Sequence, residues 1–284
     1  MRLCLDSFVP PLDRITKGTA SWIRDLGFSA VGVDLEGAVA VDKEAAGKVR
    51  GILDGEGIAI GQVWSVGTPL VRPDPGESAA HTQTLRDRVP LAAALGCRVL
   101  LTEAGGMHKA NAWYPHPENH GEETLDRLAV ALKEIAPFAA DLGIYVAPEM
   151  SLMTILSTVD RAVALVEEID QPGVGINFDP ANILDPLSLY DSGAFVDDAF
   201  DRLGSRIVNV HAKDSAAREV QSIVHLEERP AGQGVLDYGR LLRRASVLPE
   251  WTCVVVEHLT DYGQVEEVRR FLVESAAKAG VRFQ

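Results

Sequence analysis

The chain has 284 residues and a formal net charge of −14, and 46% of its residues are hydrophobic. This length suits one large α/β domain or two ordinary ones, with enough apolar material for a sizeable core. The acidic balance supplies no positive field for a phosphate backbone, which argues against nucleic acid and anionic membranes as partners.

The amino-terminal sequence MRLCLDSFVP reaches Asp6 before any long apolar stretch, so we expect neither a signal peptide nor a membrane anchor. No apolar run elsewhere approaches the length of a membrane span. Cys4, Cys97 and Cys253 lie in apolar, strand-like runs without the CxxC spacing of a metal finger. We therefore expect core thiols in a reducing compartment and a cytoplasmic protein.

Eight short aliphatic runs alternate with helix-like segments along the chain. The predicted strands are Arg2–Asp6, Ala30–Leu35, Ile58–Trp64, Arg98–Thr102, Ile144–Ala147, Val174–Phe178, Ile207–Val210 and Thr252–Val256. Gly27, Gly57, Gly96 and Gly143 each stand between a predicted helix and the next strand, where glycine commonly ends a helix.

The predicted strands are apolar almost throughout rather than alternating with polar residues. A parallel sheet covered by helices requires this pattern. Eight strand–helix units in 284 residues predict an α/β fold of the (β/α)8 TIM-barrel type. A doubly wound open sheet is the alternative, but no glycine-rich dinucleotide turn follows the first strand. Because no linker or low-complexity stretch divides the chain, we expect a single domain over residues 1–284.

The segments that follow the predicted strands are longer than those that precede them. The long segments are Ser65–Glu77, Ala104–Gly121, Ala181–Ser192 and Ala212–Val235. Long loops after the strands mark the active face of such a barrel, so we expect the functional site at the carboxyl ends of the strands.

Titratable or aromatic side chains stand at or just after most of these strand ends: Asp34, Glu36, Trp64, Glu103, Glu149, Asp179, His211 and Glu257. The last four close four consecutive strands, which are neighbours in a barrel, so their side chains can converge. Three carboxylates in a water-poor pocket repel one another unless a cation lies among them. One imidazole and three carboxylates therefore predict an octahedral or five-coordinate site for Mn²⁺, Mg²⁺ or Co²⁺.

Each of these residues also has a plainer interpretation. A single acid after a strand is usually a helix N-cap or a solvated loop residue, and this is our expectation for Asp34, Glu36 and Glu103. Taken alone, His211 would be a hydrogen-bonded core histidine. The metal site is favoured because four such residues close four successive strands.

The order Glu149, Asp179, His211, Glu257, within the local sequences VAPEM, NFDPAN, VNVHAKD and VVVEH, resembles the xylose isomerase-like TIM-barrel family. Members of that family include ketose 3-epimerases, hydroxypyruvate isomerase, inosose dehydratase and endonuclease IV. The resemblance extends over nearly the whole chain. It implies a divalent metal held by these four residues, with Mn²⁺ favoured over Mg²⁺ or Co²⁺, and a homo-oligomer.

For activity, the resemblance implies a sugar isomerase or epimerase that removes a proton next to a carbonyl. A metal that chelates a carbonyl and its neighbouring hydroxyl acidifies the proton between them and stabilises the enediolate. In the epimerase relatives the matching glutamates remove and return the proton. This would make Glu149 and Glu257 the base and the acid, with Asp179 and His211 as purely structural ligands. The expected partner is a small neutral sugar or keto-sugar.

The chain departs from the ketose 3-epimerase pattern at two positions. Asn182 stands three residues after Asp179, where those relatives usually carry a histidine, and an amide binds a hydroxyl but shuttles no proton. Ile155 stands six residues after Glu149, where the relatives tend to carry a second glutamate. These departures leave open a lyase or dehydratase acting on a keto-sugar, keto-glycoside or inosose. A barrel that binds a sugar without turning it over is a third, less favoured hypothesis.

Further candidates for substrate contacts lie in the loops. Lys213 and Arg218 in HAKDSAAR are suited to donate to substrate oxygens, and a surface salt bridge is the alternative for each. Trp113 and His116 in the loop AGGMHKANAWYPHPENHG are candidates for a wall or lid over a sugar ring, unless that loop merely packs on the rim. Trp64 would lie over the metal if it points inward, and a core tryptophan is the alternative.

Overall fold

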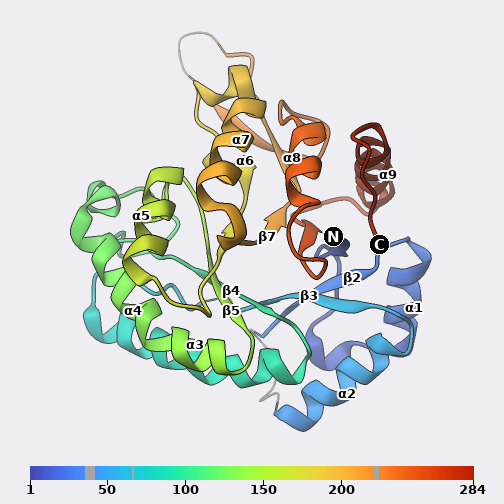
Figure 1. Ribbon diagram of the computed structural model, residues 1–284, viewed down its shortest axis with the longest axis horizontal. Helices are drawn as coiled ribbons and strands as arrows, with labels where there is room; N and C mark the ends of the chain where they lie inside the picture. Colours follow the sequence, from blue (N-terminus) through green and yellow to red (C-terminus); the bar gives the residue numbers. More distant parts are fainter. Residues whose placement is uncertain (36–41, 66, 221–223) are drawn as a thin grey trace.

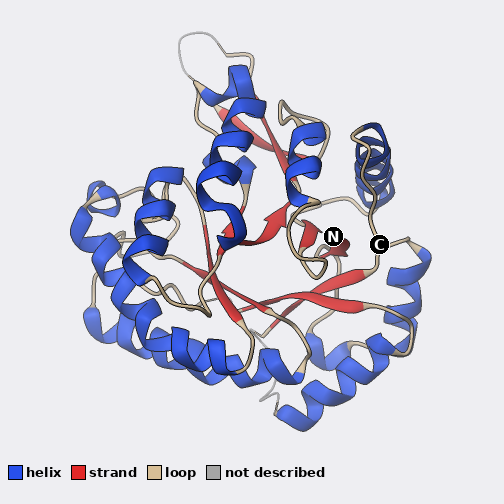
Figure 2. Ribbon diagram, viewed as in Figure 1, coloured by secondary structure: helices blue, strands red, loops and turns tan. Residues whose placement is uncertain are grey.

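The computed structural model describes residues 1–35, 42–65, 67–220 and 224–284. Its centre is a closed barrel of eight parallel strands in chain order, with helices packed around the outside (Figures 1 and 2). The barrel strands are β1 (Arg2–Leu5), β2 (Ala30–Asp34), β3 (Ala59–Trp64), β4 (Val99–Glu103), β5 (Tyr145–Glu149), β6 (Ile176–Phe178), β7 (Ile207–His211) and β10 (Cys253–Val256). The predicted (β/α)8 barrel is confirmed, and the ends of the eight strands differ from the prediction by at most two residues.

The helices begin where the sequence supplies caps, because most of them start after a threonine or aspartate whose side chain accepts a backbone N–H. They are α1 (Lys17–Asp25), α2 (Lys43–Asp54), α3 (Pro75–Ala94), α4 (Glu122–Asp141), α5 (Val159–Ile169), α6 (Pro180–Ile183), α7 (Ser192–Leu203), α8 (Tyr238–Ala245) and α9 (Gly263–Lys278). No helix among the described residues combines the length and the apolar character needed to cross a bilayer. The four glycines predicted to end helices all have positive φ, between 68° and 82°.

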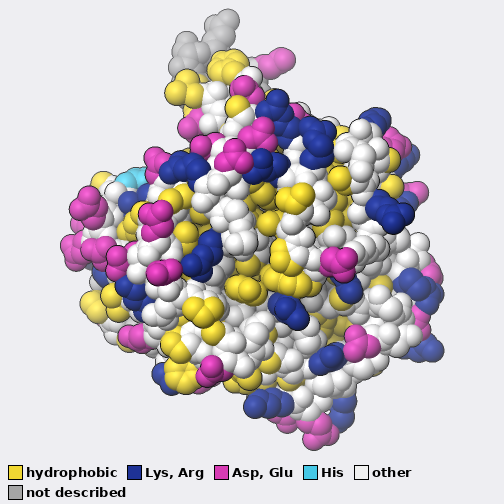
Figure 3. Space-filling model, viewed as in Figure 1, with side chains coloured by type: hydrophobic (Ala, Val, Ile, Leu, Met, Phe, Trp, Pro, Cys, Tyr) yellow, Lys and Arg dark blue, Asp and Glu magenta, His cyan; other side chains and the backbone are white. Residues whose placement is uncertain are grey.

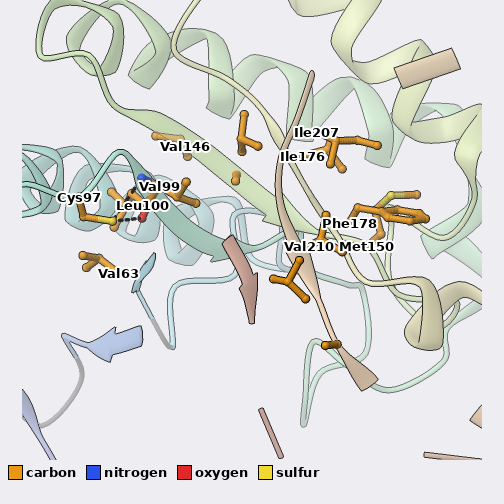
Figure 4. Packing of buried hydrophobic residues seen from close by; sticks show 14 of the residues in the cluster. Val63, Cys97, Val99, Leu100, Val146, Met150, Ile176, Phe178, Ile207 and Val210 are labelled. Carbon is orange, nitrogen blue, oxygen red and sulfur yellow. Dashed lines mark hydrogen bonds between the residues drawn. The ribbon is translucent and has the colours of Figure 1, made fainter. Parts of the chain in front are cut away.

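The main core lies between the barrel and the surrounding helices. Ile176 of β6 pairs in register with Ile207 of β7, and Figure 4 shows the two side chains close together. Phe178 extends this layer and packs edge-to-face on Phe200 of α7, with ring centroids 5.5 Å apart. The apolar strand sequences follow from this arrangement, because the helices cover the outer face of strands whose inner face is also buried.

The three cysteines are free and buried, as predicted for core thiols. Cys97 donates a hydrogen bond from Sγ to the carbonyl oxygen of Val99 at 3.3 Å (Figure 4). Burial raises the pKa of the Cys97 thiol to about 12, so the thiol stays protonated at neutral pH.

A hairpin that the sequence did not predict lies within the segment 212–235, which we expected to be a loop. Strands β8 (Lys213–Ala217) and β9 (Leu226–Pro230) pair antiparallel and extend away from the barrel (Figure 1). Asp214 fastens the base of the hairpin: Oδ1 accepts the N–H groups of Ser215 and Leu236 at 2.9 and 3.0 Å, and Oδ2 accepts that of Gly232 at 3.1 Å. The hairpin therefore begins at a fixed point directly after β7.

Gly61 of β3 occupies a place in the barrel where a side chain does not fit. A Cβ atom there would lie 2.6 Å from Cys253 Sγ and 2.9 Å from Cys4 Sγ. We predict that Gly61→Ala lowers the free energy of unfolding by about 1–3 kcal/mol through overpacking, measured by urea denaturation.

The matched control for this prediction is Gly47→Ala in α2, where an added Cβ meets nothing within 4 Å. It should be neutral or stabilising by about 0.5–1 kcal/mol, because alanine favours a helix interior over glycine. Equal stability of the two variants would contradict the packing argument.

Candidate metal centre

Glu149, Asp179, His211 and Glu257 close or directly follow the neighbouring strands β5, β6, β7 and β10. All four are buried, and one potential ligand atom from each lies within 4.8 Å of the others. His211 Nδ1 lies 2.8 Å from Glu257 Oε1, 3.0 Å from Glu149 Oε1 and 3.6 Å from Asp179 Oδ2. The structure thus brings together the four residues that the sequence singled out, in an arrangement able to hold a divalent ion.

Asp179 is positioned by the turn that begins α6. Its Oδ1 atom accepts the backbone N–H groups of Ala181 and Asn182, at 3.0 and 3.2 Å. Its Oδ2 atom is turned the other way and lies 2.7 Å from Lys213 Nζ. One oxygen therefore caps the helix while the other remains available to the centre.

The buried Lys213 ammonium lies against two of the three carboxylates, 2.7 Å from Asp179 Oδ2 and 2.7 Å from Glu257 Oε1. Burial acts to raise the pKa of Asp179 and Glu257, but Lys213 and His211 together hold both pKa values below their ordinary range. Burial raises the pKa of Glu149, against the opposing effect of His211. The surroundings thus shift the pKa values of the two glutamates in opposite directions.

His211 is completely buried, and burial acts to lower its pKa. Glu257, Asp179 and Glu149 outweigh that effect and raise the pKa of His211 well above its usual range. On the opposite edge of the ring, Nε2 lies 3.1 Å from Oε1 of the buried Gln62. The histidine thus presents Nδ1 to the three carboxylates.

The donor atoms fit a hard or borderline divalent cation. Within the described part of the chain, Glu257 Oε2 is buried without a hydrogen-bond partner. The facing oxygens of Asp179 and Glu257 are in contact with the cationic groups of Lys213 and His211. Three carboxylates and one imidazole nitrogen suit Mg²⁺, Mn²⁺ or Co²⁺, and the unpartnered oxygen supplies a further donor.

Two cavities flank these residues at the barrel mouth. The first, of about 310 Å³, is lined by Asp6, Asp34, Trp64, Glu257 and His258 among others. The indole Nε1 of Trp64 is buried and has no hydrogen-bond partner in the described residues. Trp64 thus shares a cavity with a candidate ligand, and the partly buried Asp34 borders the same space.

The second cavity, of about 530 Å³, lies beside β5, β6 and the hairpin. Its lining combines Asn182 and Glu228 with the apolar side chains of Leu152, Met153 and Leu184. Asn182 also donates from Nδ2 to Glu149 Oε1 at 3.3 Å. This amide therefore connects the cavity with one of the candidate ligands.

Glu103 and Trp113 are joined to each other at the rim. Glu103 is 7% exposed, accepts the N–H of Gly67 at 3.0 Å and also accepts the indole of Trp113. The expectation that Glu103 is a helix cap or a solvated residue is therefore wrong. It is a buried anchor that holds the aromatic side chain of the fourth loop in place.

Two predicted contact residues are placed elsewhere. His116 accepts the N–H of Glu118 through Nδ1 at 3.3 Å and caps the short helix η2 (Pro117–His120). Arg218 has a side chain 64% exposed and forms an ion pair with Glu227 across the hairpin, at 3.3 Å. Neither side chain belongs to the cluster of Glu149, Asp179, His211 and Glu257. The remaining candidate, Glu36, lies outside the described residues.

Sequence reasoning missed four residues around the centre: Asp6, Gln62, Glu228 and His258. His258 adopts a left-handed φ of 56° directly after Glu257, and its Nδ1 lies 3.1 Å from Glu228 Oε1 and 3.5 Å from Lys213 Nζ. The sequence does contain a signal for Gln62, because it is a polar residue inside the apolar run IAIGQVW. Asp6 closes the first predicted strand and His258 ends the quoted sequence VVVEH, whereas Glu228 stands in no recognisable local pattern.

The molecular surface carries no single-sign field over the face shown in Figure 3, where basic and acidic side chains are interspersed. That face therefore has no basic stripe of the kind that binds nucleic acid, as expected for a chain with a net charge of −14.

We predict that Lys213→Met destabilises metal-free protein by about 3–5 kcal/mol at pH 7, because it removes one of the two cations that face the buried Asp179 and Glu257 carboxylates. Lys213 lowers the folded-state pKa of Asp179 and Glu257, so its stabilisation is present above their ordinary values of 3.8 and 4.5. This stabilisation declines as the pH falls below those ordinary values toward the lower folded-state values, so the difference in stability between wild type and variant should begin to shrink below about pH 4.5. Denaturation of EDTA-treated protein between pH 3 and 7 measures this.

The matched control is Lys133→Met, which removes a more exposed ammonium that pairs with Glu168 on the surface at 2.6 Å. Its effect should be small at every pH. A pH-independent loss of stability in Lys213→Met would mean that packing of the lysine stem, and not its charge, supports the centre.

The fold and centre can be set beside those of known proteins. A TIM barrel protein from Mycobacterium smegmatis, solved in complex with magnesium, is 17% identical with a TM-score of 0.72, covering 98% of this chain and 97% of that one. A D-psicose 3-epimerase from Clostridium cellulolyticum H10, solved with D-tagatose, is 13% identical with a TM-score of 0.71, covering 99% and 100%. The probable 3-DHS dehydratase AsbF from Bacillus anthracis is 14% identical with a TM-score of 0.69, covering 96% and 98%.

These structures share the fold at low sequence identity, and no curated protein matches the sequence. The family model described as xylose isomerase-like TIM barrel matches residues 20–272. Since that match spans most of the 284 residues, the chain belongs to the xylose isomerase-like TIM barrel family.

Proposed function

We propose that the protein is a divalent-metal-dependent sugar isomerase or epimerase that acts by removing a proton next to a carbonyl. The observation that carries this proposal is the buried convergence of Glu149, Asp179, His211 and Glu257. These four residues would hold the ion, with Mn²⁺ favoured and Mg²⁺ or Co²⁺ as alternatives. A bound divalent ion would polarise the substrate carbonyl and acidify the neighbouring C–H group.

The two glutamates are suited to opposite roles. Glu149 has a pKa raised by burial and lies beside the neutral amide of Asn182, which makes it the base that takes the proton. Glu257 Oε1 lies 2.7 Å from Lys213 Nζ, so the ammonium can supply the proton that Glu257 returns to the substrate. Asp179 and His211 remain structural in this proposal.

The substrate we propose is a small neutral sugar or keto-sugar. In the first cavity, Asp6 and Asp34 offer acceptors for hydroxyl groups and Trp64 offers an indole face and an unpartnered N–H. Asn182 and Lys213 would contact substrate oxygens from the other side. Arg218 and His116 are left out of the binding site, since the structure places both on other partners.

We also propose a homo-oligomeric cytoplasmic enzyme. Support for an oligomer comes from α4 and the residue that follows it, where Val130, Phe138 and Leu142 recur at multiples of four residues and are 58%, 42% and 48% exposed. Spacing of this kind places the three side chains on one helix face, and a subunit contact would remove that apolar surface from water.

The test is wash-in of deuterium in D₂O, followed by NMR over a panel of ketoses and inososes with Mg²⁺ or Mn²⁺ present. Wild type should exchange a single carbon-bound proton, and removal of the metal should stop the exchange. Glu149→Gln and Glu257→Gln should each reduce exchange by at least about 100-fold, because an amide cannot accept or return the proton.

The control variant is Glu168→Gln, which alters a surface glutamate paired with Lys133 and should exchange as wild type. Undiminished exchange in both active-site variants would rule out the assignment of base and acid. Wild-type protein that binds no divalent ion would instead favour a sugar-binding barrel without turnover.

A lyase of the dehydratase type is the second candidate, and the second cavity favours it. That cavity extends from Asn182 over an apolar lining, which leaves room for a substituent that departs after the proton is removed. The leaving oxygen would take a proton from Lys213, while the electron pair left by the C–H bond forms the new double bond. With 3-keto-glycosides, a new enone absorbance and release of the aglycone would identify this reaction, whereas exchange without either product identifies the isomerase.

A further inference from the structure

A line of buried polar side chains crosses the barrel next to the candidate metal centre. It runs from Asp6, after β1, through Gln62 on β3 to Asn209 and His211 on β7, and the last three are 0% exposed. Strands β3 and β7 stand on opposite sides of the closed barrel, so Gln62 spans its interior. Neither the four-residue centre nor the proposed proton transfer accounts for this line.

The direction of each hydrogen bond in the line follows from its chemistry. Gln62 Nε2 donates to Asp6 Oδ2 at 2.5 Å. Asp6 Oδ2 thus faces an amide nitrogen, which can only donate, and accepts its N–H. The amide nitrogen of Gln62 therefore faces Asp6, and its oxygen faces β7.

The amide oxygen of Gln62 can only accept hydrogen bonds. It receives one from Asn209 Nδ2 at 2.6 Å, and it lies 3.1 Å from His211 Nε2. His211 must therefore carry a proton on Nε2 to satisfy this contact. The other nitrogen, Nδ1, is the atom that faces Glu149 and Glu257.

We propose that Gln62, oriented by Asp6, is a positioning residue that fixes His211 as the Nε2–H tautomer and so presents the Nδ1 lone pair to the metal. This inference rests on the proposed metal binding. Glutamine suits the position because its amide carries one donor for Asp6 and one acceptor for the imidazole at the end of a side chain that reaches across the barrel. Leucine keeps the approximate volume but supplies neither group.

The experiment compares wild type with Gln62→Leu and Gln62→Glu by two measurements. Mn²⁺ affinity is measured by titration calorimetry, and the histidine tautomers are read from ¹⁵N-imidazole NMR spectra of Mg²⁺-loaded protein. Each spectrum covers the 7 histidines of the chain, and His211→Asn assigns the signal of interest. Neither measurement depends on a substrate.

In wild type, His211 should be protonated on Nε2. Gln62→Leu should weaken Mn²⁺ binding about 10- to 100-fold, as loss of a hydrogen-bond partner behind a metal-bound histidine typically does, and should abolish the single tautomer. Gln62→Glu retains an acceptor for Nε2–H and should keep the tautomer. The control Gln83→Leu removes an exposed amide that pairs with Asp87 on α3 and should bind as wild type.

The possible failures are distinguishable. If wild type binds no divalent ion, the proposed function fails, and Gln62 cannot orient His211 toward a metal. If wild type binds but carries the proton on Nδ1, or if Gln62→Leu keeps both affinity and tautomer, the role of Gln62 is overturned. Should Gln62→Leu fail to fold, the wild-type spectrum and Gln62→Glu still decide the question.

Discussion

Burial of three carboxylates side by side is the constraint on which this structure depends. Glu149, Asp179 and Glu257 lose their water at the mouth of the barrel, and Lys213 and His211 supply positive charge within hydrogen-bonding distance. Four adjacent barrel strands deliver the carboxylates and the imidazole. A change of strand register there would separate charges as well as disturb the core, so charge balance and barrel geometry stabilise the same arrangement.

Most of the fold was predictable because the barrel strands are buried on both faces and therefore appear as continuous apolar runs. The same reasoning located the four candidate ligand residues, since strand ends lie at one rim of a parallel barrel. The hairpin β8–β9 escaped prediction because KDSAA and LEERP have neither apolar character nor alternation. Backbone pairing and the contacts of Asp214 hold these strands, and neither leaves a periodic trace in the sequence.

The surroundings of the centre were less predictable than its ligands. Gln62 contacts both Asp6 and Asn209 across the barrel although the three lie far apart along the chain, so no local spacing reveals the connection. The burial of Glu103 was not predictable, because the sequence around an acid that follows a strand does not show whether a loop will cover it. For Arg218, the proximity to His211 in sequence was misleading, since the hairpin carries it away from the barrel.

The hairpin has a consequence for how this barrel can diversify. Its base supplies Lys213 to the carboxylates, while residues of β9 form part of the wall of the larger cavity, where Glu228 lies 3.7 Å from the same ammonium. Asp214 anchors the base of the hairpin through backbone hydrogen bonds. Substitutions farther along the hairpin can therefore reshape the cavity wall without displacing the Lys213 ammonium. The residues proposed to shape the substrate site and those proposed to support its chemistry thus occupy different portions of one ribbon, so mutation can alter the first group while the second persists.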